Sequence, residues 1–162
     1  MYIEKISDEN QIEIIEDLAN EIWSEYFTAI IGKAQVDYML EKFQSKKAIY
    51  EQIKNGYLYF LINSNSESIG YIGVLLKEHE LFLSKLYIKL SERNRGYGRS
   101  AIMFLEKLAI GKGLDKISLT VNRYNSDTIQ AYKKFGFENT GTVVQDIGSG
   151  FVMDDYKMER VV

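Results

Sequence analysis

The spacing of apolar residues in the first third of the chain predicts helices. Residues 2–6 are a candidate for a short strand, and Ser7 or Asp8 after it is suited to cap a helix. The apolar residues of that helix recur three and four positions apart, which places them on one face. A second helix is predicted over Lys33–Phe43. Residues 45–55 are expected to add a further turn or two of helix. The face of the first helix consists of Ile12, Ile15, Ala19 and Ile22, followed by Trp23, Tyr26 and Phe27.

From Gly56 onward the helical spacing of apolar residues is lost, which indicates a change from helices to strands. Residues 57–63 and 69–76 are rich in aromatic and branched side chains, and a polar turn joins them. Residues 80–88 continue the same pattern. The three segments therefore predict an antiparallel meander.

The last third of the chain alternates between helix and strand, which favours the α/β class. A strand that arrives after a helix is expected to pair in parallel with the strand before that helix. The predicted segments are a helix at 101–109, a strand at 116–121, a helix at 127–134 and a closing hairpin of strands at 137–146 and 151–160.

A glycine-spaced loop, residues 93–100 with the sequence RNRGYGRS, lies between a predicted strand and a predicted helix. A loop that opens a helix leaves several backbone N–H groups without partners, and the helix dipole adds partial positive charge there. Three arginines in seven residues strengthen the pattern, because guanidinium groups bind phosphate oxygens in a fork. The loop therefore predicts a site for a ligand that carries a pyrophosphate.

Two common phosphate motifs compete for this loop. The Walker A motif ends in Gly-Lys-Ser/Thr, which is missing here. The dinucleotide motif G-x-G-x-x-A is satisfied by residues 96–101. In that motif the first glycine directly follows a strand, whereas seven residues separate Ile88 from Gly96 here. The acidic residue expected about 20 positions later is also missing. Both differences disfavour a nicotinamide dinucleotide.

The loop also fits the pattern R/Q-x-x-G-x-G/A through Arg93, Gly96 and Gly98. A second block, residues 125–137 with the sequence NSDTIQAYKKFGF, follows after one strand. It fits N-x-x-A/S-x-x-x-Y-x-K-x-G-F, with Thr128 in the position of the small residue. In both motifs, in their order and in their spacing, the chain resembles the GNAT N-acetyltransferases, whose coenzyme A loop has the first pattern.

The resemblance covers roughly residues 57–160 well and the first 56 only loosely. It implies an α/β fold with a mixed, mostly antiparallel sheet of about six to seven strands, splayed between two parallel strands, with helices on both faces. It also implies one domain over residues 1–162. The implied reaction is direct transfer of an acetyl group from the cosubstrate acetyl-CoA to a primary amine, and a branch that acetylates polyamines is one expectation.

Such a transfer needs a held thioester, a deprotonated amine, a polarised carbonyl and a proton for the departing thiolate. The resemblance implies that Tyr132 is the general acid. Ile129, Tyr132 and Phe135 also form an apolar helical stripe, so a packed core tyrosine stays open. The implied cofactor-binding residues are Leu86, Tyr87 and Ile88 through their main chain, Arg93, Asn94, Arg95, Gly96, Tyr97, Gly98, Arg99 and Ser100 around the pyrophosphate, Asn125 on the pantetheine arm and Lys134 on the phosphates.

The general base is harder to assign. Glu80 opens the strand that leads to the thioester, and a carboxylate there is suited to relay a proton through water. Residues 77–80 fit a polar turn equally well. Asp146, Asp154 and Asp155 add negative charge on the closing hairpin. If these carboxylates converge with Glu80, they would attract a cationic amine such as a polyamine.

Composition narrows the chemistry further. The 162 residues carry a net charge of −3 with acidic and basic residues interspersed, so no nucleic-acid partner is expected. The absence of cysteine excludes disulfides, thiolate metal ligands and a cysteine nucleophile, and a single histidine argues against a metal cluster. No apolar run approaches the ~20 residues that span a bilayer, and no signal peptide is evident. We therefore expect a cytoplasmic protein without a metal or a membrane partner.

Two functions stay open from the sequence. One is an acetyltransferase, and the other is an acyl-CoA-binding sensor or regulatory domain of the same fold that transfers nothing. The acceptor of the enzyme is a small-molecule or peptide amine, among them a polyamine, an amino-sugar antibiotic, a protein amino terminus or a small amino acid. Trp23 and Tyr26 are suited either to line the acceptor site or to pack in the core. A homodimer is compatible with both functions.

Overall fold

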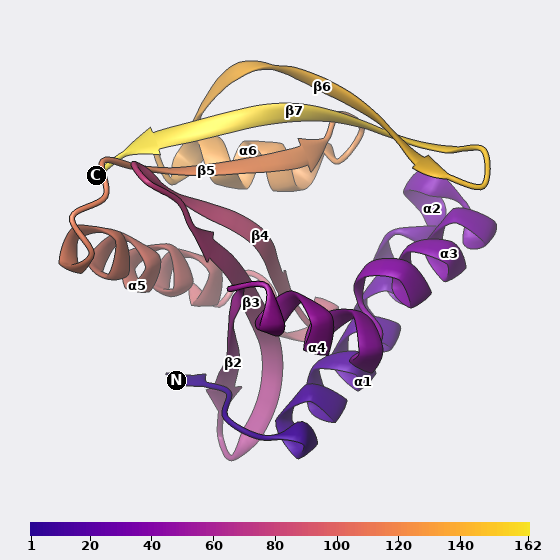
Figure 1. Ribbon diagram of the computed structural model, residues 1–162, viewed down its shortest axis with the longest axis horizontal. Helices are drawn as coiled ribbons and strands as arrows, with labels where there is room; N and C mark the ends of the chain where they lie inside the picture. Colours follow the sequence, from indigo (N-terminus) through magenta and orange to yellow (C-terminus); the bar gives the residue numbers. More distant parts are fainter. The chain divides into compact units, whose positions relative to one another are not determined.

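The computed structural model describes residues 1–162 and contains a seven-stranded sheet in the order β1-β2-β3-β4-β5-β7-β6 (Figure 1). β4 and β5 pair in parallel, whereas the pairs β1–β2, β2–β3, β5–β7 and β6–β7 are antiparallel. The prediction of a mixed, mostly antiparallel α/β fold is confirmed. The elements are β1 (Tyr2–Lys5), α1 (Glu9–Tyr26), α2 (Thr28–Ile31), α3 (Lys33–Phe43), α4 (Lys46–Lys54), β2 (Leu58–Ser64), β3 (Glu67–Leu76), β4 (Glu80–Ile88), the 3-10 turn η1 (Leu90–Glu92), α5 (Tyr97–Gly111), β5 (Lys116–Asn122), α6 (Ser126–Lys134), β6 (Glu138–Gly148) and β7 (Phe151–Val161).

The chain divides into two compact units. Unit 1 comprises Met1–Leu75 and Lys85–Ala101, and unit 2 comprises Leu76–Ser84 and Ile102–Val162. β4 and α5 therefore each contribute one part to unit 1 and another part to unit 2. That residues 1–162 form one domain stays a prediction.

Unit 1 is organised around α1, which packs against α3 and α4. Figure 1 shows β2 and β3 side by side in this unit. Asp8 caps α1, because its carboxylate accepts a hydrogen bond from the Gln11 amide (2.9 Å), while Gln11 Oε1 accepts one from the Asp8 amide (3.3 Å). The predicted apolar face of α1 is confirmed as core. Fully or nearly fully buried residues of unit 1 include Ile12, Ile15, Ala19, Ile22, Ile49, Leu61 and Ile72.

Unit 2 contains the parallel strand pair. Glu80 to Leu83 of β4 pair with Lys116 to Leu119 of β5, and this pairing ends there although both strands continue. On its other side β5 pairs with β7, and β6 is the edge strand. The crossover that α5 provides between β4 and β5 is the reason for the predicted parallel pairing.

The structure differs from the prediction at the start of α5. The helix begins at Tyr97, not at Ala101 as predicted, and it ends at Gly111 as expected from the glycines there. Gly98 disfavours a helix at this point, because glycine in a helix costs about 1 kcal/mol relative to alanine. A tertiary contact outweighs that local preference, since the Tyr97 hydroxyl lies 3.0 Å from Ser64 Oγ of β2. The second half of the glycine-spaced loop is therefore the first turn of the helix.

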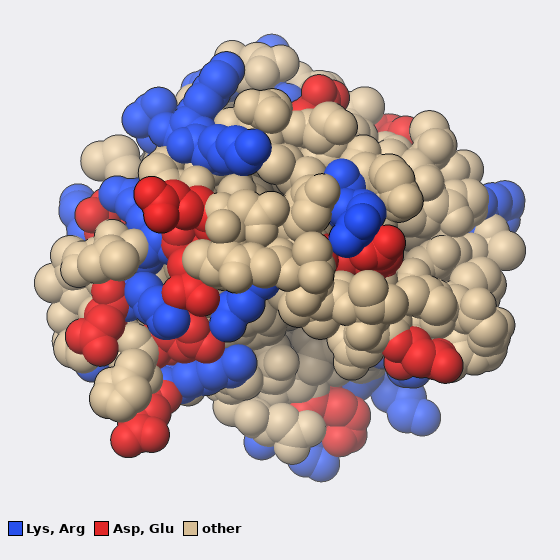
Figure 2. Space-filling model, turned by 90° about the horizontal axis from the view of Figure 1, so that it is seen from above, with Lys and Arg blue, Asp and Glu red and all other residues tan.

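The surface carries charges of both signs. On the face drawn in Figure 2, lysines and arginines lie among aspartates, glutamates and uncharged surface, without one continuous basic area. Among the helices of the structure, none combines the length and the apolar character needed to cross a bilayer.

Candidate functional site

The loop before α5 belongs to unit 1 and ends in a left-handed turn. Asn94 and Gly96 have φ angles of 62° and 83°, and α5 begins at Tyr97. Ser100 N donates to Gly96 O (3.1 Å), which closes the first turn of the helix. The main-chain amides of Tyr97 and Gly98 precede that bond, so they have no acceptor inside the helix. Together with the helix dipole they form a site suited to a phosphate group.

Two of the three arginines of the loop, Arg93 and Arg95, differ in their surroundings. The Arg93 guanidinium stacks 4.2 Å from the centre of the Tyr26 ring, and its Nε donates to the Ile88 carbonyl (3.3 Å). Arg95 pairs with Glu92 (3.3 Å) and stays exposed. The side chain of Arg93 therefore holds the loop to α1 and β4, and we expect the main chain to be its contribution to phosphate binding.

The end of β4 is fixed from two sides. A Cβ atom added at Gly70 of β3 would overlap the carbonyl oxygen of Tyr87, so only glycine allows these two strands to approach so closely. The Tyr87 ring packs 5.5 Å from that of Trp23 and 5.4 Å from that of Tyr71. Gly70 was not singled out from the sequence, because its requirement comes from a strand that follows later in the chain.

The aromatic residues of α1 serve packing. Trp23 is 3% exposed and its ring lies 4.3 Å from that of Phe27. Tyr26 is covered by the Arg93 guanidinium. Of the two roles that the sequence left open, the geometry supports packing in the core for Trp23, whereas Tyr26 is half-buried beneath Arg93.

Unit 2 carries the second sequence block. Tyr132 of α6 is buried, with its ring 5.4 Å from that of Phe137. Burial raises the pKa of the Tyr132 phenol well above its usual value. The phenol is therefore fully protonated at neutral pH, yet it is a weaker acid toward a thiolate than an exposed tyrosine. This environment fits the packed tyrosine as well as the general acid, and the catalytic role stays a prediction.

The two other residues of this block lie at the ends of α6. Asn125 precedes the helix and is buried, and its side chain makes no capping hydrogen bond. Its carbonyl accepts from Ile129 N (3.0 Å). Lys134 is exposed at the last turn. The contact of Asn125 with the pantetheine arm stays a prediction.

Glu80 lies at the start of β4 in a group of ion pairs. Its carboxylate is 3.8 Å from both Lys77 Nζ and Lys116 Nζ. Glu80 and Leu86 are six positions apart on one extended strand, which corresponds to about 20 Å. These contacts favour the structural role of Glu80 over the role of a base acting at Leu86 to Ile88.

The three aspartates of the closing hairpin do not form one acidic group with Glu80. Asp146 caps the hairpin by accepting from Gly148 N (2.8 Å), and Asp154 pairs with Arg123 Nε (2.8 Å). Asp155 lies opposite Asn122, at the end of β5 that is distant from Lys116 and Glu80. These four carboxylates therefore do not come together as the acidic acceptor site that the sequence predicted.

Asp155 has the most unusual environment of these carboxylates. It is 5% exposed, and no ion pair holds it. Burial raises its pKa to about 6, a hydrogen bond with the Thr120 side chain lowers it, and the neighbouring Asp154 raises it slightly. A carboxylate that titrates this close to neutrality is suited to accept a proton. Sequence spacing alone did not separate Asp155 from Asp154, because only tertiary burial distinguishes them.

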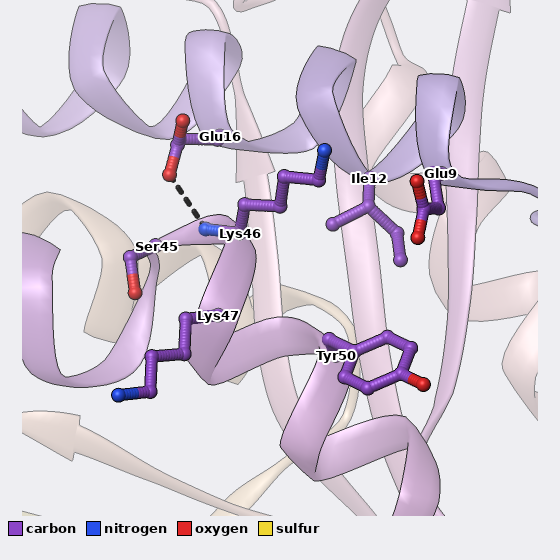
Figure 3. A pocket seen from close by; sticks show the side chains of 7 residues that line it. All are labelled: Glu9, Ile12, Glu16, Ser45, Lys46, Lys47 and Tyr50. Carbon is purple, nitrogen blue, oxygen red and sulfur yellow. Dashed lines mark hydrogen bonds between the residues drawn. The ribbon is translucent and has the colours of Figure 1, made fainter.

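A pocket of unit 1 lies apart from all of these residues. It encloses about 490 Å³ between α1 and α4, and Figure 3 shows Glu16 of α1 bonded to the Lys46 amide (2.5 Å). Acidic and basic side chains line it in equal number, and none belongs to the two motifs. Its lining consists of Glu9, Ile12, Glu16, Ser45, Lys46, Lys47 and Tyr50.

The comparisons with known proteins agree with this geometry. Residues 15–137 match the profile of the Acetyltransferase (GNAT) family. The chain therefore belongs to the GNAT acetyltransferase family, whose members generally transfer acyl groups from acetyl-CoA. The resemblance seen in the two motifs is confirmed.

Individual relatives extend over the whole chain. A protein of Thermoplasma acidophilum named spermidine N(1)-acetyltransferase is 27% identical over 158 residues, which cover 94% of each chain. The crystal structure of a PaiA N-acetyltransferase from Thermoplasma acidophilum in complex with coenzyme A has a TM-score of 0.79 at 23% identity, with 100% of both chains covered. A GCN5-related N-acetyltransferase from Rhodopseudomonas palustris has a TM-score of 0.81 at 14% identity, covering 99% of this chain and 95% of that one. These structures share the fold.

Proposed function

We propose that this protein transfers the acetyl group of acetyl-CoA to a primary amine of a small, cationic acceptor of the polyamine class. The observation that carries the proposal is the left-handed loop at Asn94 and Gly96, which opens α5 inside a chain of the GNAT family. The spermidine acetyltransferase from Thermoplasma acidophilum supports the class of acceptor. A polyamine is also an acceptor that a chain of net charge −3 does not repel.

The proposed roles follow from the kinds of group that each segment offers. The amides of Tyr97 and Gly98 bind the pyrophosphate, and the main chain of Leu86 to Ile88 bonds the pantetheine arm and the thioester carbonyl. The neutral amine attacks the carbonyl carbon, so that a C–N bond forms, the C–S bond breaks and the nitrogen loses one proton, which balances the proton given to the thiolate. Tyr132 supplies the proton for the departing thiolate.

The acceptor amine must first lose a proton, and Asp155 is our candidate for the group that takes it. Its carboxylate is buried and has no cationic partner, whereas Glu80 is paired with two lysines. A base whose pKa lies just below neutrality is ionised at pH 7 and still accepts protons readily. This assignment replaces Glu80 as the proposed base.

A thiol-release assay tests the proposed function. Acetyl-CoA is incubated with the protein and with spermidine, spermine, an aminoglycoside, an alanyl peptide or free alanine, and free coenzyme A is measured against a control without amine. We expect amine-dependent release, fastest with the polyamines. Binding of acetyl-CoA without release for any amine would instead support the non-catalytic sensor. Faster release with the peptide would assign a protein amino terminus as the acceptor.

A further inference from the structure

A lysine is buried in unit 1 directly before the strand segment Leu86 to Ile88. Lys85 of β4 is 5% exposed. Its Nζ donates to the carbonyl oxygen of Phe43 (2.6 Å), to Gln52 Oε1 (2.9 Å) and to the Tyr59 hydroxyl. None of these three acceptors carries a charge. Burying an ammonium group without a carboxylate partner costs free energy. We therefore looked for a function that the charge of Lys85 serves at this position.

The hydrogen atoms around Lys85 can be counted. A protonated ammonium has three N–H donors, and the structure offers three acceptors. The Tyr59 hydroxyl donates a hydrogen bond to Gln52 Oε1 (2.5 Å), and Gln52 Nε2 donates one to the Phe43 carbonyl oxygen (3.1 Å). The three hydrogens of the ammonium and the hydrogen of the Tyr59 hydroxyl therefore all have acceptors. A neutral amine has only two hydrogens, so one acceptor would lose its bond.

The position of the Phe43 carbonyl adds to this preference. Phe43 is the last residue of α3, where the helix dipole places partial negative charge. The ammonium therefore binds the end of α3 and a side chain of α4 while its own backbone belongs to β4. In this way one side chain joins three elements at the residue that precedes the proposed thioester strand.

Burial opposes the charge. It lowers the pKa of Lys85 to about 7, and no charged neighbour offsets this. The groups that face Lys85 from α3 and α4 are a carbonyl and an amide, which do not titrate. From β2 it faces the Tyr59 phenol, whose pKa burial raises, with smaller contributions from Tyr87 and Tyr57. The tyrosines thus stay neutral over the range in which Lys85 titrates.

We propose that Lys85 is a positioning residue for acetyl transfer, whose ammonium fixes Leu86 to Ile88 by tying β4 to the end of α3 and to α4. The proposal rests on the proposed function, because those three residues are assigned there to the thioester. Loss of the proton removes one hydrogen bond from the group of Lys85, Tyr59 and Gln52 and weakens the attachment of β4 to α3 and α4. Acetyl-CoA affinity and turnover then depend on the charge of a residue that does not touch the substrate.

The test compares Lys85→Met with Lys54→Met. Methionine keeps the length and apolar stem of lysine, and the bonds among Tyr59, Gln52 and Phe43 survive without Lys85. Lys54 is an exposed lysine of α4 paired with Glu51, so its replacement is the matched control. Acetyl-CoA affinity and kcat are measured from pH 6 to 9. Because all variants bind the same ligand, any titration of acetyl-CoA itself cancels in the comparison.

We expect the affinity of the wild type and of Lys54→Met to fall as the pH rises through about 7. Lys85→Met should bind about tenfold more weakly at pH 6 and show no such fall, since a small displacement of a positioned segment has effects of this size or larger. Wild-type affinity and turnover in Lys85→Met at every pH would overturn the proposal. A loss that is the same at every pH, with the pH dependence retained, would overturn it as well.

A second variant covers the case in which Lys85→Met does not fold. Tyr59→Phe removes one acceptor and leaves the lysine in place, so the midpoint of the pH profile should move to lower pH. An unmoved midpoint would contradict the proposal. The proposed function fails separately: if the wild type binds no acetyl-CoA at all, that function is wrong. If it binds with an affinity that does not change with pH, only the positioning role of Lys85 is wrong.

Discussion

The two units of the chain offer different kinds of functional group. Unit 1 offers main-chain groups, namely the amides at the start of α5 and the backbone of Leu86 to Ile88. Unit 2 offers the ionisable side chains of Tyr132 and Asp155. Main-chain amides and carbonyls do not ionise at any pH, whereas carboxyl and phenol side chains do. Changes in unit 1 should therefore alter acetyl-CoA affinity, and changes in unit 2 should alter turnover.

The same contrast holds for the buried ionisable groups. Burial lowers the pKa of Lys85 in unit 1 to about 7 and raises that of Asp155 in unit 2 to about 6. One physical cause, the loss of hydration of the charged form, shifts a base downward and an acid upward. Lys116 in unit 2 shows what exposure changes, because its bond to Glu159 raises its pKa instead. For Lys85 and Asp155, burial without a counter-ion therefore brings the pKa close to neutrality.

The largest effect is expected for Tyr132→Phe, which removes one hydroxyl and keeps the packing against Phe137. If Tyr132 is the general acid, kcat falls by roughly 10²–10⁴ with acetyl-CoA affinity nearly unchanged. If it is a packed core residue, activity per folded molecule is preserved and the cost appears in stability, on the order of 1 kcal/mol. Measuring kcat and the melting temperature on one preparation separates these outcomes.

Asp155→Asn comes next and tests the base. We expect kcat to fall by roughly 10², and the rise of the wild-type kcat through pH 6 to disappear. Stability gives an independent signal. Between pH 4 and 6 the folded chain holds a proton on Asp155 that the unfolded chain has released, so wild-type stability falls as the pH rises through this window. The variant should lack this fall, which is on the order of 2 kcal/mol. A wild-type pH profile of kcat in Asp155→Asn would exclude it as the base.

Gly98→Val tests the contribution of unit 1. A branched side chain at the second residue of α5 would stand where a phosphate approaches the amides. We expect acetyl-CoA affinity to fall by roughly 10–100-fold, the size of one or two lost hydrogen bonds to a charged group. The helix itself should not weaken, since valine is a better helix former than glycine. Isothermal titration with acetyl-CoA measures this, and a folded variant with unchanged affinity would show that the loop does not hold the pyrophosphate.

The smallest effect is expected for Glu80→Gln. Its ion pairs with Lys77 and Lys116 are partly exposed, and pairs of this kind contribute little to stability. kcat should stay close to that of the wild type. A fall in kcat as large as that of Asp155→Asn would restore Glu80 as the base and remove the distinction drawn between the two carboxylates.

Much of the fold followed from local patterns. The apolar spacing in α1, the aromatic and branched residues of β2 to β4 and the helix between β4 and β5 were enough to predict the element types and the parallel pair. These features depend on neighbours within a few residues, where backbone geometry restricts the choices. The start of α5 did not follow, because the bond between Tyr97 and Ser64 joins residues far apart in the chain.

The sequence by itself determined the family, the glycine-spaced loop that we propose to bind phosphate and the position of Tyr132 in its helix, since each is a spacing of residue types along one segment. Tertiary structure alone decided which polar side chains make contacts within the protein and which are buried without a counter-ion. It placed Arg93 on Tyr26, paired Glu80 with lysines, and buried Lys85 and Asp155 without counter-ions. The physical reason is that a motif fixes local backbone geometry, whereas hydration and pKa depend on the elements that pack around a side chain, which come from distant parts of the chain.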